Sequence, residues 1–445
     1  MGQQEEKTGA REAHATSREA DVGSIARPSG AGSRAPDGGA IPPAEAWNRL
    51  VPHLEPLPAE RVRVEAAVGR ALAAPLTAAV DVPFADVSAM DGYALAGDAA
   101  VGVRVPVLGR VAAGEAPTAP LRAGCAVRIM TGAPLPEGAD RVVPVEDTDG
   151  GRDTVEVRRP PVAGAHVRRR GEIHRAGDPL LAAGDPLTPG ALALLAAHGI
   201  LEAEVHPSPR VAILVTGDEV VPPETTPGPA QIRDSHTAFL TAAAAAAGAH
   251  VTHLGLARDE PADLRARLAS GLGADLLLAT GGVSRGELDF VEPILAELGF
   301  RPLFDRIAIQ PGQPMAASVL TRSGRPPLLA LGLPGNPASA MVCFWLFARP
   351  ALRRLQGLPA GGFWEGALDA VATAPLPSAG NRDRFLPARL VASDGTLRAT
   401  PLAPRGSHDL GAFAQGTGLV RIPAGSAAAP AGSRCSVLPL AAEWG

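Results

Sequence analysis

Cysteine, aromatic side chains and long apolar runs are all scarce in this sequence of 445 residues. The three cysteines, Cys125, Cys343 and Cys435, are far apart and form no Cys-x-x-Cys motif, so neither a disulfide framework nor a thiolate metal site is indicated. Aromatic residues make up 3% of the chain, which leaves no stacking platform for single-stranded nucleic acid. The net charge is −5, and the longest basic run, residues 168–170, is typical of a solvated face. We therefore expect no nucleic-acid partner.

Apolar runs of the roughly 18–20 residues that cross a membrane are also missing. The segment TAAAAAAGAH, residues 241–250, is shorter and is typical of a helix end in a globular domain. The first residues contain no apolar core of a signal peptide, and MGQQEE has no Ser or Thr at the sixth position, as a myristoylation motif requires. Residues 1–40 show no periodicity and predict a disordered tail. The sequence thus favours a cytoplasmic protein without a membrane partner.

What the second half does contain is an alternation of buried strands and helices. Strands are predicted at 210–215, 249–256, 274–279 and 327–332, and helices at 234–248, 259–272, 290–299 and 337–355. Such alternation predicts a parallel sheet covered on both faces, so residues 208–355 are expected to form a doubly wound α/β domain. Asp234 or Ser235 is expected to cap the first helix and Asp259 the second. Pro350 is expected to kink or end the last helix.

The flanking parts of the chain are predicted to be rich in short strands. Residues 41–207 form an N-terminal region with predicted helices at 41–54 and 189–200, a strand and a helix at 62–76, and a β-rich insertion at about 104–170. Residues 360–445 are expected to form a small β domain.

Three of the predicted strands end in turns that favour ligand binding. The turns are Thr216-Gly217-Asp218-Glu219, Thr280-Gly281-Gly282-Val283-Ser284 and Leu333-Pro334-Gly335-Asn336-Pro337. In open α/β sheets, ligands bind outside the carboxyl ends of the strands, and glycine turns let backbone N–H groups approach a phosphate. One such turn is more often a simple connection between a strand and a helix, but three on a single sheet favour a phosphate-binding site.

Four acids are expected near the same edge of the sheet: Glu219, Asp259, Glu287 and Asp289. Taken singly, Asp259 is most simply a helix cap and Glu219 a solvated side chain. Together, carboxylates around a phosphate would repel it unless a hard cation lay between them. Because Mg²⁺ binds one or two carboxylates together with phosphate oxygens, the sequence predicts a Mg²⁺-assisted phosphate site.

Two stretches in the first half of the chain are also unusual. VPFADVSAMDGYAL, residues 82–95, contains Asp91 and the only tyrosine, Tyr93. RIMTGAPLPEGAD, residues 128–140, places Thr131 directly after a predicted strand. On its own, Asp91 is typical of an Asp-Gly turn, so neither stretch by itself indicates a function.

Six motifs, in order along the chain, resemble the molybdopterin molybdenumtransferase family, which includes bacterial MoeA and the E domain of gephyrin. They are SAMDGYAL, RIMTGAPLPEGAD, RRRGE (168–172), TGDEV (216–220), TGGVSRGELDF (280–290) and LPGNPASA (333–340). The resemblance covers roughly residues 41–440. It implies a central molybdopterin-binding domain similar to MoaB and Mog proteins, elongated modules from the first half and a C-terminal β domain. It further implies a homodimer with active sites between the subunits.

The reaction that the resemblance implies is Mg²⁺-dependent. Adenylylated molybdopterin binds, its phosphoanhydride link is cleaved, AMP leaves, and molybdate is inserted at the dithiolene sulfurs. The catalytic residues carried over from the family's motifs are Asp91, Thr131, Glu219, Asp259 and Asp289, of which Asp259 and Asp289 are the implied Mg²⁺ ligands. The ligand-binding residues carried over are Thr216, Gly217, Asp218, Gly281, Gly282, Ser284, Gln310, Gln313, Pro334, Gly335, Asn336, Pro337 and Ser407.

The chain departs from the family pattern where the resemblance implies an oxyanion site. Where the family often has a Lys-Pro-Gly-Lys-Pro loop, this sequence has Gln310 and Gln313. Pro387 falls where a basic residue is expected, although Arg384 and Arg389 are close to it. Each missing lysine removes a charge-assisted hydrogen bond of about 1.5–3 kcal/mol. We hypothesise that anion binding is weakened, or that arginines such as Arg285 or Arg306 substitute.

Two other functions remain open on sequence alone. A molybdopterin-binding or scaffold relative without turnover would explain the missing lysines, whereas the acids, Thr131 and the glycine turns favour the transferase. An adenylyltransferase that makes the activated pterin resembles residues 208–355 but would not need the flanking modules. The implied partners are the small-molecule substrates, a second copy of the chain and the molybdopterin adenylyltransferase. The choice between molybdate and tungstate is open.

Overall fold

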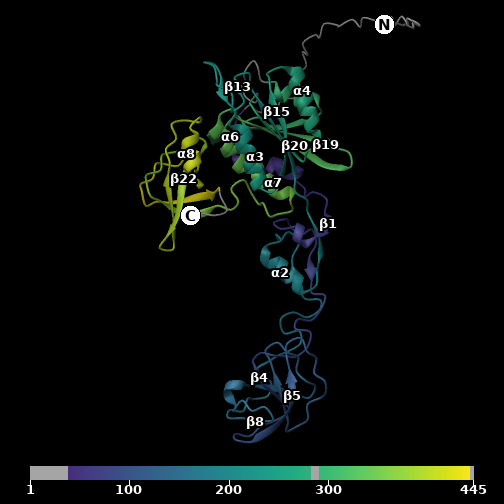
Figure 1. The fold of residues 1–445 in the computed structure, drawn as a ribbon. Coiled ribbons are helices and arrows are strands. Elements are labelled where there is room, and N and C mark those ends of the chain that lie inside the picture. The colour runs from purple at the N-terminus through teal and green to yellow at the C-terminus, as the bar shows by residue number, and fades with distance from the viewer. Residues whose placement is uncertain (1–38, 282–289, 441–445) are drawn as a thin grey trace, which may run out of the picture. The chain divides into compact units, whose positions relative to one another are not determined.

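The structure is a computed structural model that describes residues 39–281 and 290–440. The predicted tail, up to residue 38, lies outside the described residues. The described chain comprises a six-stranded α/β domain, a C-terminal β barrel and an N-terminal region that includes a five-stranded β module (Figure 1). None of the helices in these residues is both long and apolar enough to cross a membrane.

The α/β domain is built on a sheet with the strand order β15-β12-β16-β20-β19-β17. Its strands are β12 (Arg210–Thr216), β15 (His250–Ala257), β16 (Leu276–Thr280), β17 (Arg301–Phe304), β19 (Ala316–Arg322) and β20 (Arg325–Leu333). The first four strands in this order pair in parallel, which confirms the predicted doubly wound core. β19 and β17 add antiparallel pairs at one edge and were not predicted, because neither strand has the uniformly apolar run of a buried strand.

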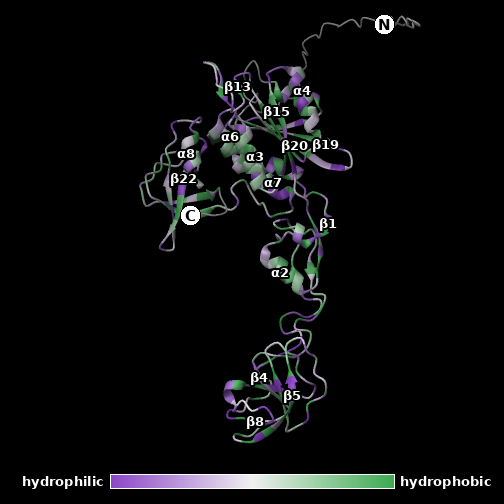
Figure 2. Ribbon diagram, viewed as in Figure 1, coloured by the Kyte–Doolittle hydropathy of each residue, from purple (hydrophilic) through white to green (hydrophobic). Residues whose placement is uncertain are grey.

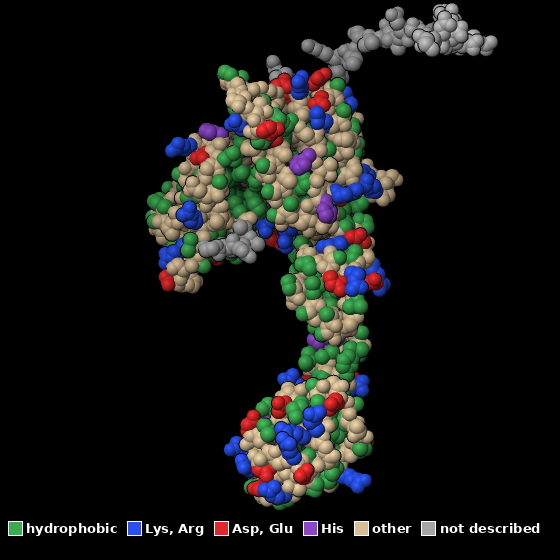
Figure 3. Space-filling view, in the orientation of Figure 1, with side chains coloured by type: hydrophobic (Ala, Val, Ile, Leu, Met, Phe, Trp, Pro, Cys, Tyr) green, Lys and Arg blue, Asp and Glu red, His purple; other side chains and the backbone are tan. Residues whose placement is uncertain are grey.

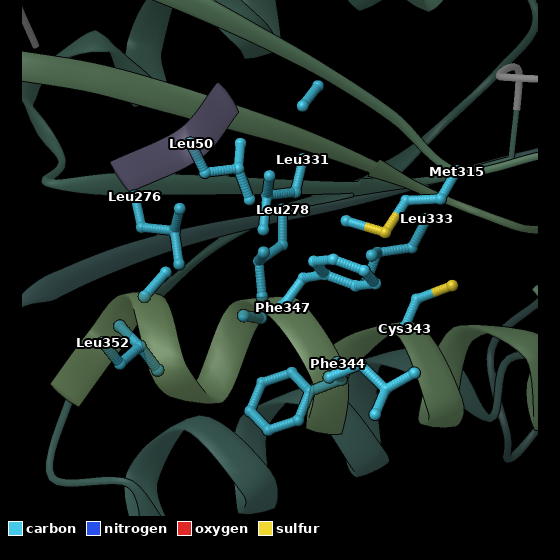
Figure 4. Close-up of a cluster of buried hydrophobic side chains, with 14 of the residues drawn as sticks. Leu50, Leu276, Leu278, Met315, Leu331, Leu333, Cys343, Phe344, Phe347 and Leu352 are labelled. Atoms are coloured by element: carbon cyan, nitrogen blue, oxygen red, sulfur yellow. The ribbon is translucent and has the colours of Figure 1, made fainter. Parts of the chain in front are cut away.

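Alternate side chains of the central strands face two hydrophobic clusters, one on each side of the sheet. The helices are α3 (His236–Ala246), α4 (Pro261–Ser270), α5 (Val291–Glu297), α6 (Pro337–Cys343) and α7 (Arg349–Leu355). On β16, Leu276 and Leu278 face the cluster under α3, α6 and α7, whereas Leu277 and Ala279 face the cluster under α4 and α5. Figure 4 shows Leu278 beside Phe347 in the first cluster, and Figure 2 shows hydrophilic residues on the outer surface of α4.

Two helix starts differ in what stabilises them. Helix α3 begins near the predicted cap, because the Asp234 carboxylate accepts hydrogen bonds from the backbone N–H groups of His236 and Thr237 at 2.9 and 3.0 Å. The prediction that Asp259 caps α4 was wrong: Glu260 is the cap residue, and it makes no side-chain cap. Pro261 begins this helix with a fixed φ and one fewer N–H group to satisfy, so a capping side chain is less needed.

The last helix of the domain runs through Pro350 instead of ending there. A π-helical segment, Phe344–Ala348, joins α6 to α7, and the N–H of Arg349 donates to the carbonyl of Phe344. Pro350 has no N–H to donate to the preceding turn, so the hydrogen-bond ladder changes register just ahead of it. The irregularity predicted at Pro350 therefore falls in the turn before it.

The first part of the N-terminal region pairs segments that are far apart in sequence. Its elements are α1 (Pro43–Leu50), β1 (Glu60–Arg63), β2 (Leu76–Thr77), β10 (Pro179–Leu181), α2 (Pro189–Ala197) and β11 (Glu202–Val205). β1 pairs with β11, and β2 pairs with β10. The helix predicted within 62–76 was wrong: only one 3₁₀ turn, Val64–Ala66, follows β1. The turn ends at Ala67, Gly69 then adopts a φ of 79° that is incompatible with a helix, and Leu72 bridges to Val205.

The five-stranded module has the strand order β7-β4-β6-β5-β8. Its strands are β4 (Gly92–Leu95), β5 (Arg104–Val111), β6 (Ala126–Ile129), β7 (Arg141–Pro144) and β8 (Thr154–Glu156), and β3 (Val87–Ser88) pairs separately with β9 (Val167–Arg168). β4 lies ahead of the insertion predicted at about 104–170. Glycine is required at its start, because a Cβ added to Gly92 would lie 2.0 Å from the carbonyl oxygen of Val143.

The C-terminal domain is a closed barrel. Its elements are β21 (Leu368–Ala372), β22 (Asp383–Ser393), β23 (Thr396–Pro401), α8 (Leu410–Gln415), β24 (Gly418–Ile422) and β25 (Arg434–Pro439). The pairing of β22 with β24 closes the ring of five strands. β18 (Ile309–Gln310) precedes β19 in the sequence and pairs in parallel with the start of β22. This pairing fixes the loop after β18 beside a barrel strand.

Replacing Leu331 by alanine is expected to destabilise the α/β domain. Leu331 is fully buried on β20 in the cluster that contains Phe347, so truncation leaves a cavity that costs about 2–5 kcal/mol. Ile232, 53% exposed on β14 (Ile232–Arg233), is the control, and Ile232→Ala is expected to change the free energy of unfolding by less than about 0.5 kcal/mol. Urea denaturation of both variants measures the difference. Equal midpoints would contradict the position of Leu331 in the core.

Candidate active site

The order of the strands reverses between β12 and β16. The chain runs from β12 through α3 to β15 on one side, and then through α4 to β16 on the other side of β12. In doubly wound sheets, ligands bind at such a reversal, outside the carboxyl ends of the strands. Thr216 ends β12 and Thr280 ends β16, and the register of the pair sets Val215 opposite Thr280. The first two predicted turns therefore start side by side.

The turns that follow these strands are packed closely enough to require glycine. Gly281 has a φ of 79°, and a Cβ added to it would lie 2.6 Å from both the carbonyl oxygen and Oγ1 of Thr216. The third turn approaches as well, because a Cβ added to Gly335 would lie 3.8 Å from the Cα of Gly281. In the described part of the chain, the hydroxyls of Thr216 and Thr280 are buried without a hydrogen-bond partner. The three turns thus meet, with bare backbone at their meeting point.

Acidic side chains lie around the end of β12. The N–H of Gly217 donates to the carbonyl of Ala257 at 3.3 Å, and the N–H of Asp259 donates to Asp218 Oδ1 at 3.2 Å. The Glu219 carboxylate folds over Gly217, where an added Cβ would lie 2.6 Å from Glu219 Oε2. Figure 3 shows acidic side chains among arginines at this end of the domain, around α4. The structure brings Asp218, Glu219 and Asp259 to one edge of the sheet.

Of the two Mg²⁺ ligands expected from the sequence, only one lies within the described residues. Asp259 is half-buried just after β15, whereas Asp289 lies outside the described residues, together with Gly282, Ser284 and Glu287. Within residues 39–281 and 290–440, no three His, Cys, Asp or Glu side chains are arranged to hold a metal ion. The described carboxylates are hard oxygen donors of the kind that Mg²⁺ prefers, so Asp259 fits that role chemically.

A cleft of about 380 Å³ lies where the loop after β18 faces the barrel strand β22. Its lining includes three residues expected from the sequence, Gln310, Gln313 and Ser407, and also Arg382 and Arg384. The guanidinium of Arg382 donates to Gln313 Oε1 at 2.7 Å. The described residues that line the cleft include no Asp or Glu. Positive and neutral donors therefore surround a space that suits an anion.

Of the two arginines that line this cleft, the sequence pointed only to Arg384, as a neighbour of the expected basic position. Arg306 is not among the residues that line the cleft, and Arg285 lies outside the described residues. Arg382 was missed because it lies 69 residues from Gln313 in the sequence, and only the pairing of β18 with β22 brings the two segments together. A signal was present, because arginines at alternate positions, 382 and 384, face the same side of a strand.

The strand-end turns and the cleft share one short segment. Pro334 to Pro337 form the turn after β20, and the chain continues directly into α6. The N–H of Ala338 donates to the carbonyl of Ser407 at 3.1 Å, and Ser339 lines the cleft. A ligand that follows this segment can therefore occupy both places at once.

Asp91 and Thr131 meet on the five-stranded module. The backbone N–H and the hydroxyl of Thr131 both donate to Asp91 Oδ1, at 2.7 and 2.8 Å. These hydrogen bonds, aided by the charge of Arg128, hold the pKa of the Asp91 carboxyl below its usual range. In the described chain, neither side chain hydrogen-bonds to the strand-end turns or to the cleft. The pair is therefore an exposed, ionised site of its own.

Comparisons with known proteins agree with this architecture. Family models match the MoeA N-terminal region (domain I and II) at residues 41–199, the "Probable molybdopterin binding domain" at 212–354 and the MoeA C-terminal region (domain IV) at 369–440. Molybdopterin molybdenumtransferase 2 of Mycobacterium tuberculosis is 38% identical over 386 residues, which cover 84% of this chain and 93% of that protein. The chain belongs to the molybdopterin molybdenumtransferase family. The molybdopterin molybdenumtransferase of a Nostoc species is 36% identical over 403 residues, 88% of this chain and 91% of that protein.

Solved structures share the fold of this molybdopterin molybdenumtransferase family member. A molybdopterin biosynthesis MoeA protein from Pyrococcus horikoshii is 30% identical, covers 91% of this chain and 100% of its own, and aligns with a TM-score of 0.76. A second MoeA structure from the same organism is 25% identical, with coverage of 90% and 99% and a TM-score of 0.75. The resemblance stated from the six sequence motifs is thereby confirmed.

Replacing Thr131 by valine is expected to raise the pKa of Asp91 toward its ordinary value, because the hydroxyl donor is lost, whereas Thr131→Ser keeps it. A carboxyl whose pKa is lowered by folding stabilises the fold above its ordinary pKa, and this stabilisation is lost as the pH falls through the lowered value. The valine variant should therefore lose less stability on acidification than the parent. NMR titration of the Asp91 carboxyl measures the shift, and an unchanged pKa in Thr131→Val would contradict it.

Proposed function

We propose that this protein inserts molybdate into adenylylated molybdopterin and releases AMP. The observation that carries the proposal is the segment from Pro334 to Ser339. It belongs both to the glycine turns at the strand ends, which suit a phosphate, and to the cleft, which suits an oxyanion. The names of the relatives supply molybdopterin and molybdenum as reactants. Two adjoining sites, one for a phosphoanhydride and one for an oxyanion, are what such a reaction needs.

In this proposal the strand-end turns bind the phosphoanhydride. Gly281 and Gly335 leave the backbone uncovered, and backbone N–H groups at such turns bind phosphate oxygens. The buried hydroxyl of Thr216, without a described partner, is a further donor at the same point. Ser284, with Gly282, belongs to the same proposed site and lies outside the described residues.

The carboxylates at this edge account for the proposed Mg²⁺ requirement. Asp259 and Asp289 would hold the ion, which when bound neutralises phosphoanhydride charge. Asp218 orients the backbone that carries Asp259, because its Oδ1 accepts the Asp259 N–H. The exposed Glu219 carboxylate, folded over Gly217, is suited to orient a water or take a proton at the cleaved bond.

The cleft is the proposed place for molybdate. Gln310 and Gln313 offer amide donors and Ser407 a hydroxyl, all of which can bind oxyanion oxygens. A pterin that lies along the shared segment would place its dithiolene sulfurs toward the cleft. Molybdate held there can then bond to the two sulfurs once AMP has left: two Mo–S bonds form as one Mo–O bond breaks, and the two thiol protons leave with that oxygen as water.

A second copy of the chain is proposed to supply Asp91 and Thr131. The support is an exposed apolar surface on the same part of the chain: Phe84 is 70% and Ile173 57% exposed. The two lie close together, because the N–H of Ile173 donates to the carbonyl of Val82. Gathered exposed apolar side chains are typical of protein interfaces. The proposed homodimer would thus bring the ionised Asp91 to the strand-end site of its partner.

The non-catalytic alternative is weakened by the charge of the cleft. That alternative rested on the glutamines in place of lysines, but Arg382 and Arg384 also line the cleft. The molybdopterin adenylyltransferase enters this proposal as a partner protein that delivers the activated pterin, and not as the activity of this chain.

Purified protein with Mg²⁺ and adenylylated molybdopterin is expected to release AMP, and molybdate is expected to stimulate the release. Asp259→Asn should lower the rate by about tenfold or more, equivalent to about 1.4 kcal/mol, because a ligand to the cation is lost. Asp289→Asn should act in the same direction. Glu297→Gln, which removes an exposed carboxylate paired with Arg265, is the matched control. Tight pterin binding without AMP release at any molybdate concentration would favour the non-catalytic alternative.

Gly281→Ala is expected to weaken molybdopterin binding by about tenfold or more. The added methyl would collide with Thr216 and cover the backbone at the meeting point of the turns. Gly324→Ala is the matched control, because Gly324 also has a positive φ, 66°, in the same domain but has no atom within 4 Å of an added Cβ. Fluorescence titration with molybdopterin compares the two. Similar losses in both variants would mean that backbone strain, and not the close approach, is responsible.

A further inference from the structure

A second cavity lies at the amino ends of the parallel strands, away from the edge that carries the glycine turns. Its volume is about 480 Å³. Arg210 and His250 begin β12 and β15, Asp275 directly precedes β16, and Arg325 begins β20, and all four line the cavity. Because these strands pair in parallel, their first residues lie at one edge of the sheet. The cavity is therefore separate from the candidate active site.

The rest of the cavity wall comes mainly from the N-terminal region and the link to β12. These lining residues are Leu57, Pro58, Glu60, Arg70, Pro207 and Ser208. The N–H of Leu57 donates to the carbonyl of Leu355 at 2.9 Å, and Arg70 donates to the carbonyl of His206 at 2.9 Å. Hydrogen bonds to the backbone thus fix this wall against the α/β domain, so the cavity belongs to the folded chain and not to loose side chains.

Positive charge is in excess around Asp275. Its carboxylate accepts hydrogen bonds from the side chain of Arg210 at 3.2 and 3.3 Å, and Arg325 Nη2 lies 3.8 Å from Asp275 Oδ1. Arg322 lies opposite Arg325 across the turn between β19 and β20, and it donates to three backbone carbonyls, which carry no net charge. Glu60, the other carboxylate of the lining, pairs with Arg70. Three guanidinium groups therefore share one carboxylate, which leaves two positive charges unbalanced.

Two of these arginines have donors that the described chain does not use. Arg322 Nη2 is buried without a hydrogen-bond partner among the described residues. Burial, together with the charge of Arg325, lowers the pKa of Arg322 below its usual range. In the same part of the chain, the only hydrogen bond from the side chain of Arg325 runs from Nη2 to the carbonyl of Gly273, at 3.0 Å. A bound anion would accept hydrogen bonds from such donors and reduce the repulsion between the arginines.

The charge and the size of the cavity indicate the class of ligand. A phosphate monoester carries close to two negative charges at neutral pH, which matches the two unbalanced positive charges, and guanidinium forks suit phosphate oxygens. The cavity is far larger than a phosphate group, since a water molecule in the liquid occupies only about 30 Å³. Its apolar lining is Leu57, Pro58, Pro207 and Pro326. No Phe, Tyr or Trp is among the described residues that line it, so an aliphatic body fits better than a stacked nucleobase.

We propose that the cavity at the amino ends of β12, β15, β16 and β20 binds a small aliphatic phosphate monoester, whose phosphate is held by Arg325 and Arg210. Arg322 adds positive charge from behind, because it donates to the carbonyl of the lining residue Pro326 at 2.8 Å. The site is distinct from the proposed reaction, which takes place at the carboxyl ends of the same strands.

Isothermal titration calorimetry of the purified full-length chain with glycerol 3-phosphate tests the assignment. Arg325→Gln is expected to weaken binding about tenfold to a hundredfold, because charge-assisted hydrogen bonds are lost, and Arg325→Lys should lose less. Arg301→Gln is the matched control, since Arg301 is an exposed arginine at the start of β17 that does not line the cavity. Arg382→Gln should also leave this binding unchanged, because Arg382 lines the other cleft.

Asp275→Asn is expected to tighten the binding of glycerol 3-phosphate, because it removes the charge that competes for Arg210 and Arg325. The asparagine oxygen can still accept the N–H of Arg210, which Asp275 Oδ2 accepts at 2.9 Å. Damage to the fold would weaken binding, so a gain in affinity cannot come from a structural defect. Thermal unfolding gives a second readout, since a ligand that binds only the native state raises its Tm, and the rise should be larger in this variant.

Two results would overturn the proposal. One is an unchanged affinity for glycerol 3-phosphate in Arg325→Gln, with the fold verified by circular dichroism. The other is glycerol 3-phosphate that binds no more tightly than inorganic phosphate, because the apolar lining would then have no role. Neither result bears on AMP release, so failure of this site and failure of the proposed transferase reaction are distinguishable.

Discussion

The parallel pairing of β12 with β16 is the constraint on which the candidate site depends. Both strands are buried on their two faces, so their apolar side chains fix them at the centre of the sheet. The pairing then sets Thr216 beside Gly281 so closely that no side chain fits between them. The bare backbone at the strand ends is therefore a consequence of core packing, and the chemistry of the turns follows from it.

A second pairing, of β18 with β22, has the same role for the cleft. It joins only two residues on β18, yet it aligns a loop of the α/β domain with the start of a barrel strand. The closed barrel holds that strand through its pairing with β23 and β24. Asp383, anchored by Arg421, decides which way its neighbours face. The short strand β18 and the start of β22 thus position the charged groups of the cleft, because the α/β domain and the barrel hold these two segments in place.

Opposite charges are sorted along the site. Asp218, Glu219 and Asp259 lie at the ends of β12 and β15, and arginines line the cleft. Carboxylates repel a phosphate unless a hard cation intervenes, whereas guanidinium groups attract an oxyanion directly. The two ends therefore suit two different anionic groups, which reduces the chance that either is bound in the wrong place. Because the sequence contains a single lysine, Lys7, the positive charge at the cleft is supplied by arginine.

Sequence by itself determined the features that local pattern encodes. The four parallel strands, the glycine turns after β12, β16 and β20 and the family motifs could all be predicted, because apolar runs and glycines act on their immediate neighbours. Burial was predicted correctly for these three strands but not for β15, an edge strand with only two buried residues. The errors arose at residues whose local conformation overrides the wider pattern. Gly69, with its positive φ, is incompatible with the helix predicted within 62–76. Pro261 begins α4, so a cap by Asp259 is not needed. Only the tertiary structure decided that Arg382 and Arg384 face the glutamines. Strand pairings between distant segments depend on the closure of the whole fold, and no local pattern in either segment specifies its partner.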